Sequence, residues 1–79
     1  MEHSTPVHTS TLEIAGREYE IVVYSRPDGS HVARTAFGPN DVILNDGVTL
    51  DDVLAKHRNL LPLAVNSRHI LQQARRTDA

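Results

Sequence analysis

The chain has 79 residues, a net charge of -2 and no cysteine. A chain of this length folds as one small domain and buries about 60% of its unfolded surface, which leaves little room for a deep catalytic pocket. The missing cysteines exclude disulfides and thiolate metal sites, and no run approaches the roughly 18 apolar residues of a membrane span. Residues 1–10 also lack the basic and apolar regions of a signal peptide. We therefore expect a cytoplasmic domain.

Charge is distributed unevenly along the chain. Up to Asp52 there are nine acidic and three basic residues, whereas five basic residues and one acidic residue follow it. Such an asymmetry fits a nucleic-acid or protein partner. It also fits acids at helix starts and arginines at helix ends, which complement the helix dipole.

The first ten residues show no periodicity and few large apolar side chains, so we predict a flexible tail at 1–10, a single α+β domain at 11–76 and a frayed end at 77–79. The first strand begins at Thr11, and Gly16-Arg17 fits a type II′ turn with glycine in its first central position. This turn predicts the pairs Ile14 with Tyr19, Leu12 with Ile21, and Glu13 with Glu20.

A second strand is predicted over 18–25, where tyrosine, isoleucine and valine are enriched. The segment Arg26-Pro27-Asp28-Gly29 is typical of a bulged hairpin turn, and the returning strand covers 30–37. The loop length predicts a set of cross-strand pairs. On the core side they are Val23 with Ala33, Ile21 with Thr35 and Tyr19 with Phe37, and on the outer side Tyr24 with Val32 and Val22 with Arg34.

Gly38-Pro39-Asn40 breaks the third strand, and the short apolar run over 41–44 is assigned as a fourth strand at the edge of the sheet. The next stretch, 45–52, turns the chain from sheet to helix. Its Asn-Asp-Gly sequence favours a tight reversal, and Thr49 followed by Asp52 is close to a capping box.

From Leu50 the apolar positions have helical spacing, with Asp52 and Lys56 as an i,i+4 ion pair. Because Pro62 removes a backbone hydrogen bond, we expect the helix to end at Leu61 or to kink there. A second helix then follows to about Arg76, and a single bent helix is the alternative. The predicted core comprises Leu12, Ile14, Tyr19, Ile21, Val23, Phe37, Val42, Leu44, Leu50, Val53, Leu54 and Leu61.

The spacing of the candidate residues argues against several kinds of metal-binding or catalytic site. The acidic stretch 41–52 has the length of a calcium-binding loop but places Ile43 and Asp46 where that loop needs an oxygen ligand and a glycine. The five histidines have no zinc-ligand spacing, and His57 is expected at the core edge with a backbone partner. No nucleophile elbow or phosphate-binding loop occurs. We therefore expect no metal, no cofactor, no small-molecule substrate and no enzyme activity.

Two surfaces remain as candidate sites. The outer sheet face should gather an apolar centre rimmed by charge, the composition of a protein-binding or homodimer surface, unless the second helix folds over it. Its residues are Val22, Tyr24, Val32, Arg34 and Glu20. The second surface is a basic helix face that could contact nucleic-acid phosphates. Its residues are Arg68, Gln72, Arg75 and Arg76.

Four features follow one another along the chain: the strand 19–23, the Asp28-Gly29 turn, a further strand, and the helix start Gly47-Val48-Thr49-Leu50-Asp51-Asp52-Val53-Leu54. In this order they resemble part of the HicB-type antitoxin domains. The family's Pro-Asp-Leu-Pro-Gly segment has no counterpart here. The resemblance implies a small regulatory protein that binds another protein.

These patterns together predict an α+β fold, a four-stranded antiparallel meander followed by two helices, or one helix kinked at Pro62, packed on the sheet. The expected function is a small regulatory or inhibitory module that binds a protein partner or itself through the outer sheet face. The alternative is an antitoxin-like regulator that binds nucleic acid through its basic C-terminal helix. No membrane partner is expected.

Overall fold

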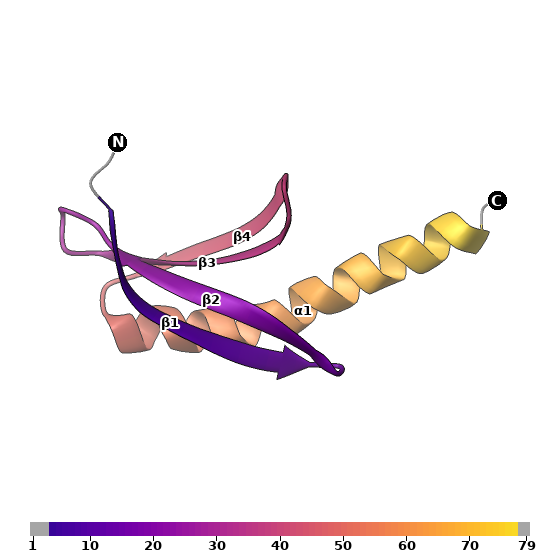
Figure 1. The fold of residues 1–79 in the computed structure, drawn as a ribbon, viewed down its shortest axis with the longest axis horizontal. Helices are drawn as coiled ribbons and strands as arrows, with labels where there is room; N and C mark the ends of the chain where they lie inside the picture. Colours follow the sequence, from indigo (N-terminus) through magenta and orange to yellow (C-terminus); the bar gives the residue numbers. More distant parts are fainter. Residues whose placement is uncertain (1–3, 78–79) are drawn as a thin grey trace.

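The computed structural model describes the backbone of residues 4–77 and the side chains of residues 4–70. The strands form one antiparallel sheet in the order β1-β2-β3-β4, and the helix lies along one side of it (Figure 1). The predicted four-stranded meander is thus confirmed. The elements are β1 (Thr5–Ile14), β2 (Arg17–Ser25), β3 (His31–Gly38), β4 (Asp41–Gly47) and α1 (Leu50–Thr77).

The turn between β1 and β2 differs from the predicted one. Ala15 and Gly16 both have positive φ, at 53° and 81°, which is the signature of a type I′ turn. The predicted type II′ turn at Gly16-Arg17 is therefore wrong. Because the turn lies one residue earlier, Arg17 is free to begin β2 opposite Ile14.

The register of β1 against β2 changes with the turn. Leu12 lies opposite Tyr19, and Glu13 lies opposite Glu18, so the predicted pairs for this hairpin are wrong by two residues. A shift of two residues keeps every side chain on its expected face, because the side-chain period of a strand is two. The unfavourable pair of like charges that the sequence predicted is therefore kept, with Glu18 in place of Glu20.

The first strand is also longer than predicted. It begins at Thr5, which pairs with Ser25, and its register shifts between Pro6 and His8. Residues 5–10 of the expected tail therefore belong to the sheet. They show no alternation of apolar residues, but their backbone groups find hydrogen-bond partners by pairing with β2. Of the rest of the expected tail, Ser4 precedes the strand, and residues 1–3 lie outside the described residues, as do residues 78–79.

The hairpin of β2 and β3 has the predicted turn. Gly29 has a positive φ of 92°, and three predicted pairs are present: Val22 with Arg34, Val23 with Ala33, and Tyr24 with Val32.

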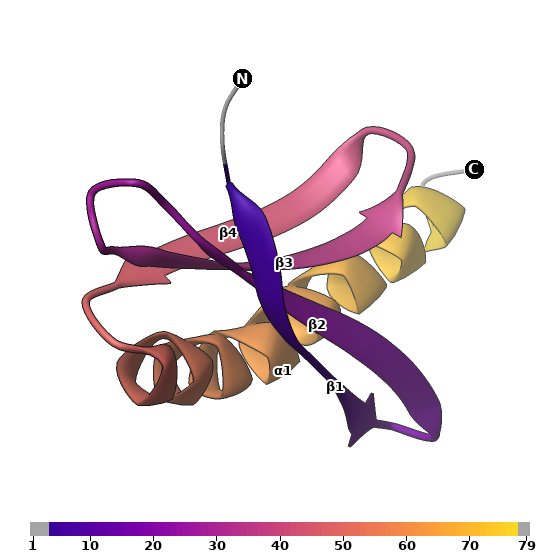
Figure 2. The ribbon, with the colours of Figure 1, turned by 60° about the vertical axis from the view of Figure 1, so that its left-hand side comes forward.

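The β2–β3 ladder stops after the Val22–Arg34 pair, so the predicted pairs of Ile21 with Thr35 and Tyr19 with Phe37 are not formed as ladder pairs. Beyond that point the β1–β2 and β3–β4 hairpins splay apart (Figure 2). The rings of Tyr19 and Phe37 still meet edge to face, with centroids 5.6 Å apart.

The fourth strand runs three residues further than predicted, to Gly47. Its register puts Ile43 opposite Thr35 on the helix side and Leu44 opposite Arg34 on the other side. Val42 and Leu44 were therefore wrongly assigned to the core. A run of apolar residues shows no alternation, so the sequence could not tell which of its side chains face inward.

The helix begins where the sequence predicted. The Asp52 amide donates a hydrogen bond of 3.1 Å to Thr49 Oγ1, which makes Thr49 the N-cap. One turn later, Lys56 Nζ lies 3.4 Å from Asp52 Oδ2, confirming the predicted i,i+4 pair. Gly47 approaches this first turn closely, since a Cβ there would lie 3.2 Å from the Val53 amide nitrogen.

The helix continues through Pro62 to Thr77, so the two predicted helices are not formed and the chain has a single helix, as in the alternative. An interior proline costs about 3 kcal/mol because a hydrogen bond is lost. Leu61, which is fully buried beside it, anchors this part of α1 to the sheet. The last turns extend past the end of the sheet (Figure 1), and the radius of gyration is 14.3 Å, against about 12 Å for a compact chain of this length.

The core lies between α1 and the inner face of the sheet. Ile21 and Val23 of β2 and Val53, Leu54 and Leu61 of α1 are buried as predicted. Ala33 joins them, and six partly buried side chains pack around this centre, five as predicted and Ile43 in place of Val42 and Leu44. The six are Leu12, Ile14, Tyr19, Phe37, Ile43 and Leu50.

Candidate protein-binding surface

The outer face of the sheet is built from alternate residues of β2, β3 and β4. Val22 and Tyr24 of β2 lie beside Arg34 and Val32 of β3, and Arg34 in turn lies beside Leu44 of β4. Partners in an antiparallel pair point to the same face. We call Val22, Tyr24, Val32 and Leu44 the outer patch.

No element of the described chain covers the outer patch. The buried residues of β2 and β3 all face α1, and both ribbon views place α1 on that opposite side (Figures 1 and 2). Leu44 is 60% exposed, while Val22, Tyr24 and Val32 are half-buried by their neighbours in the sheet. The alternative in which a second helix folds over this face is therefore not formed.

Leu44 is a member of the patch that the sequence did not identify. Its position in an unbroken apolar run favoured the core, and only the β3–β4 register places it outside. The sequence predicts no register for the fourth strand, which it ends at Leu44. The pairing of β4 with β3 over seven residues is the information that would have placed Leu44 on the outer face.

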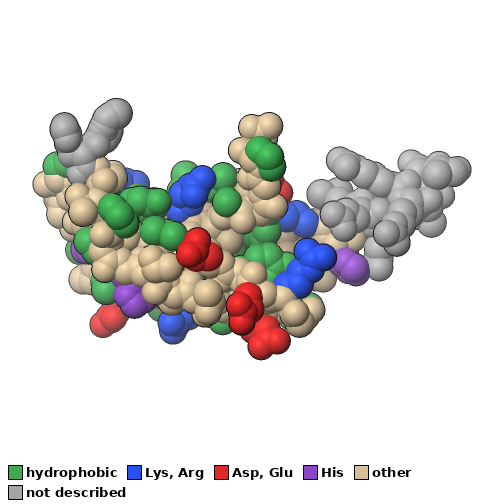
Figure 3. All heavy atoms as spheres, viewed as in Figure 1, with side chains coloured by type: hydrophobic (Ala, Val, Ile, Leu, Met, Phe, Trp, Pro, Cys, Tyr) green, Lys and Arg blue, Asp and Glu red, His purple; other side chains and the backbone are tan. Residues whose placement is uncertain are grey.

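Charged side chains surround the outer patch. Glu20 and Arg34 are exposed on this face as predicted, and the Glu13–Glu18 pair lies further along the same side of the β1–β2 hairpin. Within the described residues, these three glutamates form no ion pair. In the space-filling view, acidic side chains gather over this hairpin while apolar ones lie nearer the middle of the sheet (Figure 3).

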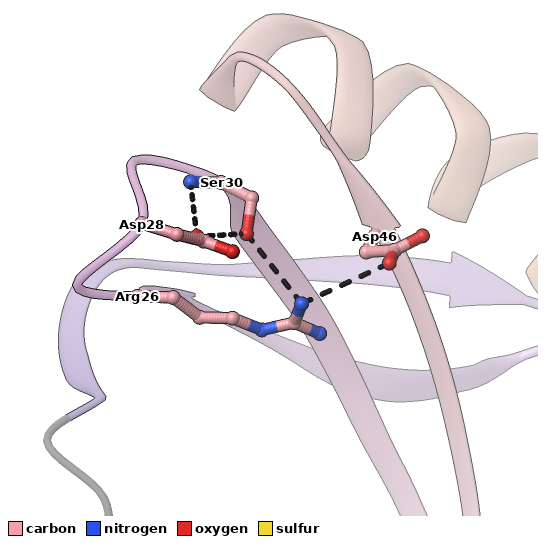
Figure 4. A network of polar contacts seen from close by, with 4 residues as sticks. All are labelled: Arg26, Asp28, Ser30 and Asp46. Atoms are coloured by element: carbon pink, nitrogen blue, oxygen red, sulfur yellow. Dashed lines mark hydrogen bonds and ion pairs between the residues drawn. The ribbon is translucent and has the colours of Figure 1, made fainter.

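The β2–β3 turn closes one end of the face through a small polar network (Figure 4). Asp28 Oδ1 accepts hydrogen bonds from the Ser30 amide at 2.9 Å and from its hydroxyl at 2.7 Å. These bonds hold the pKa of Asp28 below its usual value. Arg26 reaches from the same turn to within 3.9 Å of the Asp46 carboxylate on β4. The turn is thus ordered by its own side chains and linked to a second strand.

The predicted basic helix face is only partly available to a ligand. Arg68 donates hydrogen bonds of 2.7 and 2.5 Å to the two carboxylate oxygens of Asp41, and its guanidinium lies 4.3 Å from the centre of the Phe37 ring. This bidentate pair lowers the pKa of Asp41 and fixes α1 to the start of β4. The side chains of Gln72, Arg75 and Arg76 lie outside the described residues.

A buried polar chain crosses the core from β3 to α1 to β4. His57 and Thr35 are almost wholly buried, and Thr35 Oγ1 lies 2.7 Å from His57 Nε2. The other ring nitrogen, Nδ1, bonds to the side-chain oxygen of Asn45, whose amide nitrogen donates to the Val53 carbonyl at 3.2 Å. His57 was expected at the core edge with a backbone partner, so that prediction is wrong on both points.

The bonds of Asn45 determine the protonation of His57. Since the amide nitrogen of Asn45 donates to a carbonyl, its oxygen must accept from His57 Nδ1–H. His57 Nε2 is then the acceptor for the Thr35 hydroxyl. Burial lowers the pKa of His57 and so favours the neutral ring. A hydroxyl, an imidazole and an amide in line resemble a nucleophile with its base and orienting group, but here the hydroxyl is sealed from solvent.

The groove nearest the splayed hairpins does not reach this chain of bonds. It is open, lies between the β1–β2 turn, the start of β4 and α1, and is lined by Tyr19, Phe37, Val65 and Arg68 among others, but by neither Thr35 nor His57. Among the described residues, no three histidine, aspartate or glutamate side chains are placed to hold a metal ion. Within residues 4–77, no helix combines the length and apolarity needed to cross a bilayer.

Comparisons of the chain with protein-family models, curated proteins and solved structures found no match. The resemblance to HicB-type antitoxin domains therefore gains no support from these comparisons.

Proposed function

We propose that the protein is a non-catalytic interaction module that binds a partner protein through the outer patch. The observation that carries this proposal is the uncovered sheet face, on which four apolar side chains lie together opposite the face that α1 occupies. A monomeric domain normally covers such a face or uses it.

The charges around the patch indicate the chemistry of the partner. Glu13, Glu18 and Glu20 lie on one side without basic partners in the described chain, and Glu13 faces Glu18 directly. Like charges placed opposite each other destabilise a sheet, and a basic surface would relieve this repulsion. We infer a partner with an apolar centre and a basic rim on the glutamate side.

The sealed histidine and the shape of the groove support a non-catalytic role. The hydroxyl, imidazole and amide that would have to act on a substrate are buried, and the open groove is lined by other residues. Catalytic groups need access to a concave site where a reacting atom can bind.

Affinity capture from host lysate tests the proposal with three baits: the wild-type chain, Tyr24→Glu and Leu63→Lys. Leu63 lies on α1, away from the patch, and is 69% exposed, so its replacement is a matched surface control. We expect one partner to be retained by wild type and Leu63→Lys and lost by Tyr24→Glu, with circular dichroism showing all three folded.

Nuclease treatment of the lysate separates this proposal from nucleic-acid binding. Retention of the partner after nuclease supports a protein contact. If Tyr24→Glu captures as much partner as wild type while remaining folded, or if capture disappears with nuclease, the outer patch is not the binding surface.

A further inference from the structure

The gap between the two splayed hairpins leaves part of β2 without a strand on one side. The last pair of the β2–β3 ladder is Val22 with Arg34, and beyond it the hairpins diverge (Figure 2). On its other side, β2 stays paired with β1 as far as Arg17. We call the β3-facing side of residues 18–20 the open edge, because no strand of the described chain pairs with it.

The β1–β2 turn shows which backbone groups point out from the open edge. Ile14 and Arg17 pair across the two-residue turn, so their amides and carbonyls bond to each other. Along an antiparallel strand, alternate residues direct these groups to opposite sides. Those of Glu18 and Glu20 therefore point toward β3. Within the described residues, no backbone hydrogen bond outside the ladders involves either glutamate.

The β2–β3 turn leads to the same assignment. The Arg26 amide donates a hydrogen bond of 2.9 Å to the Ser30 carbonyl. Counting back from Arg26 in steps of two reaches Val22, which still pairs with β3, and then Glu20, which does not. The open edge thus presents two amides and two carbonyls with the spacing of a strand. The chemistry that matches such a row is the backbone of another extended chain.

The groove described above lies beside the open edge on the helix side of the sheet. It has a volume of about 820 Å³, within the range of about 300 to 1,000 Å³ that is typical of binding pockets. Tyr19, which lies between the two glutamates, lines it together with Ile14, Phe37 and Val65. A strand added to the open edge would direct alternate side chains into this largely apolar groove.

The opposite side of the same strand segment is acidic. Glu18 and Glu20 are exposed, and neither forms an ion pair within the described part of the chain. The other charged pocket residues include Arg17, which pairs with Ile14 on the helix side, and Arg68 and Asp41, which bind each other. An added strand would therefore meet negative charge on its outer side.

We propose that an extended peptide segment with the pattern basic-apolar-basic binds the open edge antiparallel to β2. Its basic residues lie opposite Glu18 and Glu20 and exchange backbone hydrogen bonds with them. The apolar residue between them lies opposite Tyr19 and enters the groove. In strand addition, the main-chain bonds give affinity and the pockets for alternate side chains give specificity.

This site is separate from the outer patch. The patch residues on β2, Val22 and Tyr24, lie beyond the open edge, where β3 is still paired. Tyr24→Glu should therefore bind such a peptide as tightly as wild type does. Each of the two proposals can thus fail while the other stands.

A nuclear magnetic resonance titration with a capped peptide of alternating lysine and valine tests the site at single amides. We expect the amide protons of Glu18 and Glu20 to shift downfield as they gain hydrogen bonds. The amides of Tyr19 and Ile21, which already bond to β1, should shift much less. No binding, or shifts that do not follow this alternation, would overturn the proposal. The same shifts in concentrated protein without peptide would identify a second copy as the occupant and would also overturn it.

Calorimetry with two charge-reversal variants tests the acidic side. Glu20→Lys places like charges opposite each other and should weaken peptide binding at least about tenfold. Asp46→Lys is the matched control, because the Asp46 side chain is 69% exposed and lies near the β2–β3 turn, at the other end of the sheet. Circular dichroism verifies that both variants are folded. Equal affinity of both variants and wild type contradicts the proposed pairing.

A peptide methylated on every lysine amide tests the backbone bonds. It keeps all side chains but cannot donate hydrogen bonds to the carbonyls of Glu18 and Glu20. We expect its binding to be lost. Binding equal to that of the unmodified peptide would show that no strand is added to β2.

Discussion

The two faces of the sheet are built from the same strands but serve different ends. On β2, Ile21 and Val23 are fully buried beneath α1, whereas Val22 and Tyr24, which alternate with them, remain partly open. The inner face also carries the buried polar chain of Thr35, His57 and Asn45, while the outer face carries glutamates that form no ion pair within the described part of the chain. Substitutions should therefore change folding stability on the inner face and binding on the outer face.

The largest effect is expected when a buried leucine is shortened. Leu61→Ala removes a side chain with no exposed area and leaves a cavity between α1 and the sheet, which should lower the free energy of unfolding by about 2 to 5 kcal/mol. Urea denaturation followed by circular dichroism measures this loss. Leu44→Ala, on the outer face, is the matched control and should change stability by less than about 0.5 kcal/mol. Equal losses would contradict the assignment of the two faces.

A smaller effect is expected from the buried hydroxyl. Thr35→Val keeps nearly the same shape but removes the donor to His57 Nε2, so an acceptor is left buried without a partner. This should cost about 1 to 3 kcal/mol. Thr11→Val, on the exposed outer side of β1, controls for the change of residue type. If both variants unfold at the same urea concentration as wild type, the bond to Thr35 does not stabilise the fold.

The acidity of His57 predicts how stability depends on pH. Burial lowers its pKa below the ordinary value of 6.5, so the unfolded chain binds this proton more readily than the folded one. The stabilisation that the neutral His57 ring gives the folded state is complete above pH 6.5. It is lost as the pH falls from there toward the pKa of His57 in the folded chain. The urea concentration at the unfolding midpoint of the wild-type chain should decrease as the pH is lowered from about 8 to about 5. The decrease should be smaller in His57→Gln, which removes this titrating group and leaves the other four histidines.

The smallest change in stability is expected from charge on the outer patch. Leu44→Lys and Tyr24→Glu replace side chains that no other element covers, and surface changes of this kind alter the free energy of unfolding by about 0.5 kcal/mol or less. Thermal melts at low protein concentration provide the check. A large loss of stability in either variant would mean that the outer face contributes to the fold.

Local signals in the sequence predicted most of the fold. The Pro27-Asp28-Gly29 turn, the Thr49 cap and the apolar spacing of α1 each have a short-range cause, and each is present in the structure. Two errors arose where the local sequence is compatible with two backbone conformations. Ala15 adopts a positive φ that alanine rarely takes, and Pro62 remains inside a helix because burial of Leu61 offsets its cost.

The candidate site was predictable only as far as the register was. Val22, Tyr24 and Val32 were placed together because the turn between their strands fixes their pairing. Leu44 was missed because the all-apolar β4 contains no alternation, so only its pairing with β3 shows which face it occupies. The bonds of His57 to Thr35 and Asn45 join three elements, and no spacing along the chain encodes them.

Pro62 should also divide α1 into two parts that unfold locally at different rates. Proline has no amide hydrogen and leaves the Arg58 carbonyl without its helical donor. Amides before this point lie over the core and should exchange with deuterium only when the whole domain unfolds, whereas those after it should exchange through a smaller, partial opening. Pro62 does not end the helix, but it would thus separate two segments whose helical hydrogen bonds persist for different times.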